Sequence, residues 1–148
     1  MERLSRELDA DGHTCLKGFL RARECEALAA RDERDDLFRS RVVMARHGFG
    51  RGEYRYFAAP LPAGIASLRA GLYEALAPIA NRWHESLGVD VRFPEDHARF
   101  LARCHEAGQR RPTPLLLDYK AGDYNCLHQD LYGEHVFPLQ VALLLSSP

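Results

Sequence analysis

The spacing of hydrophobic and polar positions along this chain changes from a helical period to an alternating one and back again. Residues 1–10 and 21–33 repeat apolar side chains every three or four positions, which predicts two short amphipathic helices. Between them, a break at Asp11-Gly12 precedes residues 13–18, for which we predict a short strand. The start of the chain is therefore expected to be mainly helical.

Alternating patterns first appear in residues 39–44 and 53–57, which are predicted to form two strands. The glycine-rich segment 47–52 joins them, and it contains neither the lysine-serine pair of a Walker loop nor a GxGxxG frame. We therefore interpret it as a hairpin loop rather than a phosphate-binding loop. The arginines of this region form either a solvated hairpin or a local anion-binding face: Arg39, Arg41, Arg46, Arg51 and Arg55.

A long helical pattern covers residues 65–83, where Pro78 is expected to kink or restart the helix. Pro94 is well placed for the first turn of a further helix over residues 95–107. Three strands are predicted after that helix, at 115–119, 124–130 and 137–145. The last is so apolar that we expect it to be buried on both faces, although the sequence ends directly after it.

Composition indicates one soluble domain over residues 1–148, with 46% hydrophobic and 28% charged residues and a formal net charge of −1. No segment approaches the roughly 20 apolar residues of a membrane span. The N-terminus lacks the apolar core of a signal peptide, and the 4 cysteines show no paired spacing. We therefore expect a cytoplasmic protein with reduced thiols.

The strongest local motif is His128-Gln129-Asp130, because alternate residues of an extended segment point to the same face. An imidazole and a carboxylate are two of the three ligands in the facial triad of non-haem Fe(II) oxygenases. An isolated motif of this kind is also found in proteins that bind no metal. A surface histidine and aspartate therefore remain the alternative interpretation.

The wider context of that motif resembles the 2-oxoglutarate/Fe(II)-dependent dioxygenases. The run LLLDYKAGDYNCLHQD at 115–130 is followed by an apolar strand, and similar strings occur at 39–52, 78–83, 108–114 and 128–140. The similarity is closest to uncharacterised bacterial members related to the prolyl-4-hydroxylase and oxidative-demethylase (alkylated DNA repair) branches. It implies an α+β fold, with a helical part over about 1–112 packed on the first strands, about 113–148, of a double-stranded β-helix or jelly roll.

The resemblance also implies a cofactor set and site residues. His128 and Asp130 would be ligands of Fe(II), with 2-oxoglutarate as co-substrate and ascorbate in a supporting role. Tyr119 or Tyr124 would donate a hydrogen bond to a 2-oxoglutarate carboxylate, and Asn125 would reach the same pocket. Both tyrosines have an alternative interpretation as ordinary aromatic strand residues.

The expected activity is hydroxylation or oxidative demethylation, on a prolyl or other amino-acid side chain or on an alkylated nucleic-acid base. Near-zero net charge favours the first substrate class over nucleic acid. The family's distal histidine and its carboxylate-binding arginine or lysine are missing, and His135 is the nearest candidate for a third ligand. We therefore expect either a fragment of a longer enzyme or a truncated, non-catalytic relative that serves in binding or assembly, with a homodimer formed through the last strand.

Overall fold

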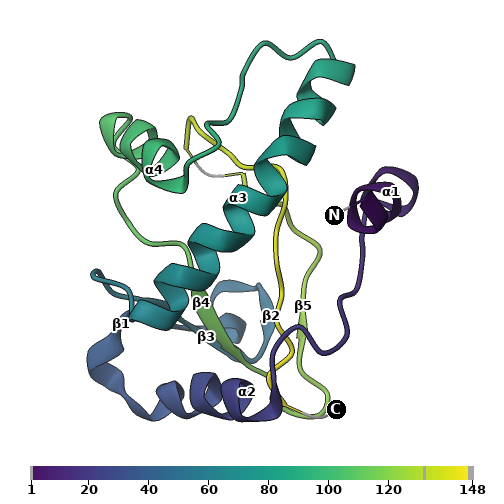
Figure 1. Ribbon diagram of the computed structural model, residues 1–148. Coiled ribbons are helices and arrows are strands. Elements are labelled where there is room, and N and C mark those ends of the chain that lie inside the picture. Colours follow the sequence, from purple (N-terminus) through teal and green to yellow (C-terminus); the bar gives the residue numbers. More distant parts are fainter. Residues whose placement is uncertain (1, 132, 147–148) are drawn as a thin grey trace.

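The computed structural model describes residues 2–131 and 133–146 and combines helices with two small antiparallel sheets (Figure 1). The helices are α1 (Glu2–Asp11), α2 (Ala22–Ala29), α3 (Ala63–Ser86) and α4 (His97–Glu106), with 3-10 turns η1 (Ala30–Glu33), η2 (Asp35–Leu37) and η3 (Met44–His47). The strands are β1 (Phe38–Val43), β2 (Gly50–Arg51), β3 (Glu53–Phe57), β4 (Leu115–Asp118) and β5 (Tyr124–Asn125).

The larger sheet has the order β1-β3-β4, with both neighbouring pairs antiparallel. Phe38 lies opposite Phe57 in this register, and their rings approach to 4.7 Å between centroids. Phe57 is only 2% exposed, so this aromatic pair anchors one face of the sheet. On the same strand, Arg55 donates to the Asp32 carbonyl and the Asp35 carboxylate, which ties η1 and η2 to the sheet.

Helix α3 crosses the molecule and carries most of the core (Figure 1). One cluster joins Tyr73 and neighbouring alanines of α3 to Phe93 and Phe100, with Phe137 and Leu139 packed against it. A second cluster joins Leu8 of α1 to Leu76 and Ile79 of α3. The amphipathic patterns of α1, α3 and α4 are thereby explained, because each buries its apolar stripe against another helix.

Helices α3 and α4 both end in a glycine-based motif that turns the chain sharply. At the end of α3, Gly88 has a φ of +67°, and the Val89 amide donates to the His84 carbonyl at 2.8 Å. At the end of α4, Gly108 has a φ of +82°, and the Gln109 amide donates to the Cys104 carbonyl at 2.8 Å. These are the bonds of the Schellman motif, which requires a left-handed residue that glycine adopts without strain.

Several predicted boundaries are wrong. Residues 13–16 are irregular and residues 17–18 form a turn, so no strand is present there, and α3 runs through Pro78 without restarting. Helix α4 begins at His97, because the Asp96 carboxylate caps the amides of Ala98 and Arg99. The predicted strand at 124–130 is reduced to the two residues of β5.

The predicted strand at 137–145 is also wrong, since no residue of this segment is paired in a sheet. Phe137 and Leu139 pack against the helices, whereas Val141 and Leu144 are 45% and 75% exposed. The expectation of burial on both faces therefore fails for most of the segment. Some apolar side chains of this segment pack against the helices, and others are exposed on the surface.

Helices and antiparallel strands together confirm the α+β class. The sheets have 3 and 2 strands, and both are smaller than those of a complete jelly roll. Among the described residues, no helix has both the length and the apolar content needed to cross a membrane.

Candidate metal centre

The segment that carries the HxD motif is attached to the glycine-rich loop between β1 and β3. Gly50 pairs with Asn125 and Arg51 pairs with Tyr124 in the antiparallel β2–β5 ladder. The Cys126 amide extends this ladder by donating to the Phe49 carbonyl at 2.8 Å. The loop predicted as a simple hairpin connection therefore supplies the strand on which the candidate site is built.

Glycine is required in that loop because the two backbones approach closely. A side chain at Gly50 would collide with the Tyr124 carbonyl, and one at Gly52 would lie 2.6 Å from the Tyr119 ring. Both glycines also have positive φ angles, +123° and +106°, which other residues rarely adopt. These two positions explain why the sequence is glycine-rich at a place with no phosphate-binding frame.

His128 and Asp130 are brought together just beyond β5. His128 Nε2 lies 3.6 Å from Asp130 Oδ2, and each side chain is 48% exposed. Two neighbouring ligand atoms in an octahedral site with bonds of about 2.1 Å are about 3 Å apart. A small side-chain movement would therefore let both atoms bind the same metal ion.

Hydrogen bonds orient each member of this pair. His128 Nδ1 lies 2.8 Å from the Cys126 carbonyl, which only accepts, so Nδ1 carries a proton and the neutral imidazole has Nε2 as its metal-binding atom. Gln140 Nε2 donates to Asp130 Oδ2 at 3.1 Å. Ligands oriented by bonds from outside the coordination shell are typical of metal sites.

Gln140 is a residue that the sequence analysis missed. The one available signal is that it is a polar residue within the apolar segment 137–145.

The three other predicted site residues lie on the adjoining ribbon. Tyr119 is 44% exposed with its ring close to Gly52, and Tyr124 is 55% exposed opposite Arg51. Asn125 is also exposed, and strand geometry points it to the opposite face from Tyr124. Within the described ranges, no hydrogen bond or ion pair joins these residues to His128 or Asp130.

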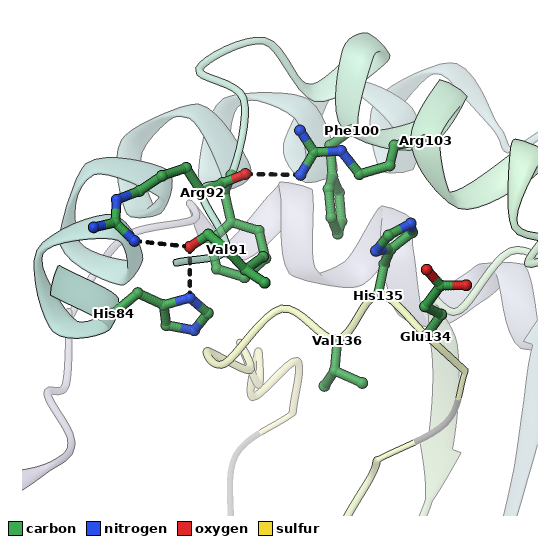
Figure 2. Close-up of a pocket in the computed structure, with 9 residues that line it drawn as sticks. His84, Val91, Arg92, Phe100, Arg103, Glu134, His135 and Val136 are labelled. Carbon is green, nitrogen blue, oxygen red and sulfur yellow. Dashed lines mark hydrogen bonds between the residues drawn. The ribbon is translucent and has the colours of Figure 1, made fainter. Parts of the chain in front are cut away.

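A third protein ligand is not found in the part of the chain that the structure describes. No group of three histidine, cysteine, aspartate or glutamate side chains there has an arrangement that would hold a metal ion. His135, the nearest candidate in sequence, instead lines a pocket beside α4 (Figure 2). The site as described consists of two ligands.

The arginines of the β1–β3 region mostly serve the fold. Arg41 forms a bidentate ion pair with Glu53 across the sheet, with contacts of 2.6 to 3.1 Å. Arg39 lies 4.4 Å from the centre of the Tyr56 ring and donates to the Pro112 carbonyl. With Arg55 bonded to η1 and η2, these contacts favour the structural interpretation of the cluster over an anion-binding face.

One family model matches the part of the chain that carries the HxD motif. The model of the Oxygenase-NA family, described as an oxygenase catalysing oxidative methylation of damaged DNA, matches residues 52–148, which include β3 through β5 and the HxD motif. The chain belongs to this oxygenase family.

Two relatives are uncharacterized proteins of Mycobacterium tuberculosis, MT2286 of strain CDC 1551 / Oshkosh and Rv2227 of strain ATCC 25618 / H37Rv. Each is 50% identical to this chain over 92 residues, which cover 62% of this chain and 40% of the relative. The aligned part therefore spans about two fifths of the length of these relatives. No solved structure matches the chain.

Proposed function

We propose that this chain is part of a 2-oxoglutarate- and Fe(II)-dependent dioxygenase that oxidises alkyl groups on damaged nucleic-acid bases. The observation that carries this proposal is the pairing of His128 Nε2 with Asp130 Oδ2 at 3.6 Å, within the segment matched by the oxygenase family. One imidazole and one carboxylate with room for further ligands are the donor set that suits non-haem Fe(II).

In this proposal, bound Fe(II) and 2-oxoglutarate use O₂ to convert a C–H bond to C–OH, with release of succinate and CO₂. His128 and Asp130 hold the metal, and the Cys126 carbonyl keeps the imidazole in the tautomer that binds it. Tyr119 or Tyr124 would donate a hydrogen bond to a co-substrate carboxylate, and Asn125 is an alternative donor to Tyr124 because the two point to opposite faces of β5. The longer protein would supply the third ligand and the remaining strands of a jelly roll.

The substrate class is inferred from the family description rather than from net charge. A formal charge of −1 gives no bulk attraction to nucleic acid, yet the family is described by its action on damaged DNA. We therefore propose an alkylated base in preference to an amino-acid side chain. Hydroxylation of an N-methyl group yields a hydroxymethyl group, which leaves as formaldehyde and restores the base.

Titration calorimetry with Co(II) in place of Fe(II) tests the proposed donor set without requiring turnover. Because two protein ligands are found among the described residues, we expect a dissociation constant weaker than about 1 µM. Adding 2-oxoglutarate should tighten Co(II) binding by about tenfold, since a keto acid chelates the same ion. Succinate, which lacks the keto oxygen, should not tighten Co(II) binding.

Matched variants separate this site from incidental histidine binding. His128→Ala and Asp130→Ala should each abolish the effect of 2-oxoglutarate. His13→Ala is the control, because His13 is exposed and its Nδ1 also bonds to a carbonyl two residues earlier, that of Asp11. The proposed centre would be refuted if 2-oxoglutarate only weakened Co(II) binding to the protein by competing for the ion. It would also be refuted if the effect of 2-oxoglutarate persisted in His128→Ala.

A further inference from the structure

A pocket of about 570 Å³ lies between the end of α3, the connection to α4, α4 itself and residues 134–136 (Figure 2). This volume is within the range of about 300–1,000 Å³ that is usual for small-molecule sites. Its apolar lining comes from Val91, Phe93, Phe100 and Val136. The polar lining includes two histidines and two arginines, one of each from either side of the pocket.

The two walls are held in place by side-chain amides. Asn81 of α3 accepts from the Phe93 amide at 2.7 Å and donates to the Phe93 carbonyl at 2.9 Å. Gln109 accepts from the His135 amide at 2.8 Å and donates to the His135 carbonyl at 3.1 Å. Each side-chain amide makes the two backbone hydrogen bonds that a neighbouring strand would otherwise make. The walls of the pocket are therefore held in place without a bound ligand.

Arg103 and His135 lie at one end of the pocket, and Arg92 lies at the other (Figure 2). Arg103 donates through Nη1 to the Arg92 carbonyl at 2.7 Å, which fixes its guanidinium beside Phe100 and near His135 (Figure 2). Among the described residues, Arg103 forms no ion pair and the His135 imidazole has no hydrogen bond. Glu134 is the one acidic residue of the lining, and it lies beyond His135 at the rim (Figure 2).

The opposite end carries His84, Val91 and Arg92, whose guanidinium donates to the Val91 carbonyl at 3.1 Å (Figure 2). His84 Nδ1 donates to the Val91 carbonyl at 2.9 Å, which holds the imidazole at this end (Figure 2). The Phe93 ring lies 4.9 Å from the His84 ring and forms the floor between the two ends. An aromatic ring in this part of the pocket would contact planar and apolar groups.

We propose that this pocket binds a nucleotide, with the phosphate at Arg103 and His135 and the base at the end lined by His84, Val91 and Arg92. A phosphate offers several strong acceptor oxygens to a guanidinium and an imidazole, and guanidinium–phosphate bonds are among the strongest in proteins. A base stacks on planar groups, and the His84 imidazole and the Arg92 guanidinium lie at the other end. The ligand is either a free nucleotide or a terminal nucleotide of a nucleic-acid strand, and this inference does not depend on metal binding by His128 and Asp130.

NMR titration of the intact chain tests the proposal through the imidazole resonances of His84 and His135. Adenosine monophosphate should cause saturable shifts of both, and adenosine should bind about tenfold or more weakly because it lacks the charge-assisted bonds. A 5′-phosphorylated dinucleotide that binds more tightly than the monophosphate would assign the site to a strand end, and equal affinity would assign it to free nucleotides.

Four variants are expected to change the affinity for the nucleotide in different ways. Arg103→Gln should weaken binding about tenfold, whereas Arg99→Gln, one turn earlier on α4, exposed and outside the pocket lining, should have a much smaller effect. Glu134→Gln should tighten binding by removing a like charge, and Val136→Trp should abolish it by filling the pocket. Equal binding of adenosine and its monophosphate, an unchanged affinity in Arg103→Gln, or no saturable shift at about 10 mM would overturn the proposal.

Discussion

Two polar side chains, Tyr73 and His97, are buried in the helical core. The Tyr73 hydroxyl donates to the Pro94 carbonyl at 2.7 Å, and the residue is 6% exposed. Burial raises the pKa of Tyr73 to about 12, because the phenolate would lose its hydration. His97 packs against the Tyr73 ring, and burial followed by the Arg69 charge lowers the pKa of His97. Both groups are therefore neutral parts of the core at physiological pH.

The shift at Tyr73 predicts a loss of stability at high pH. The unfolded tyrosine releases its proton near pH 10 and the folded one near 12, so stability falls as the pH rises through this interval. The fall should be about 2 kcal/mol by pH 11.5. Tyr73→Phe should be about 1 kcal/mol less stable at pH 7, through loss of the bond to Pro94, but should lose less stability above pH 10.

Urea unfolding from pH 7 to pH 11.5 measures this prediction. Tyr54→Phe, on the sheet, provides a comparison for general alkaline effects. If Tyr73→Phe and the parent chain lose stability in parallel above pH 10, the proposed origin of the shift is wrong.

At the scale of secondary-structure elements, the sequence predicts those whose partners are close along the chain. The alternation in 53–57 predicts β3 with its observed bounds, and the helical period predicts α3 and α4 to within a few residues. The HxD spacing predicts that His128 and Asp130 share a face, and the structure places them 3.6 Å apart. Local periodicity is sufficient for these features because each depends on neighbouring residues.

Features that depend on distant contacts could not be predicted. The apolar segment 137–145 has the composition of a buried strand, but Phe137 packs on Tyr73, Phe93 and Phe100 instead, with ring centroids 5.0 to 6.1 Å apart. The pocket beside α4 is lined by both His84 and His135, whose backbone is held by the Gln109 side chain, and no sequence pattern links these positions. Tertiary packing overrides the local preference in both cases.

The β2–β5 ribbon depends on glycine, and this predicts opposite effects for two Gly→Ala substitutions. Gly50→Ala should destabilise the chain by about 1 to 3 kcal/mol, because its φ is +123° and a methyl group would meet the Tyr124 carbonyl. Gly71→Ala, in the open middle of α3, should stabilise it by about 0.5 to 1 kcal/mol. Thermal unfolding of both variants measures the difference, and a stable Gly50→Ala protein would contradict the ribbon register.

At the scale of the whole molecule, the described surface is unusually apolar near the end of the chain. Exposed apolar side chains gather along β4, β5 and the final segment: Leu117, Tyr119, Tyr124, Leu127, Leu131, Val141, Leu143 and Leu144. Exposed apolar surface of this kind marks an interaction site or an aggregation hazard. By contrast, α1 is firmly docked, because Asp9 accepts hydrogen bonds from Trp83 at 2.6 Å and from Arg82 at 2.8 Å.

We predict that the isolated chain self-associates through the final segment. Sedimentation velocity should show a dimer that increases with protein concentration, and Leu144→Asp should shift the equilibrium toward monomer because Leu144 is 75% exposed. Leu87→Asp is the matched control, since Leu87 is equally exposed but lies at the end of α3. A monomer at every concentration, or equal effects of the two substitutions, would exclude this interface.

Paramagnetic broadening by Mn(II) is the most direct test of the claim that His128 and Asp130 form the metal centre. Substoichiometric Mn(II) should first remove the amide signals of residues 126–130 and then those of the β2 strand paired with β5. The competing location is the acidic surface pocket lined by Glu74, Glu95 and Asp96. The account predicts selective broadening around His128 that is lost in Asp130→Ala, and selective broadening around Glu95 in both proteins would contradict it.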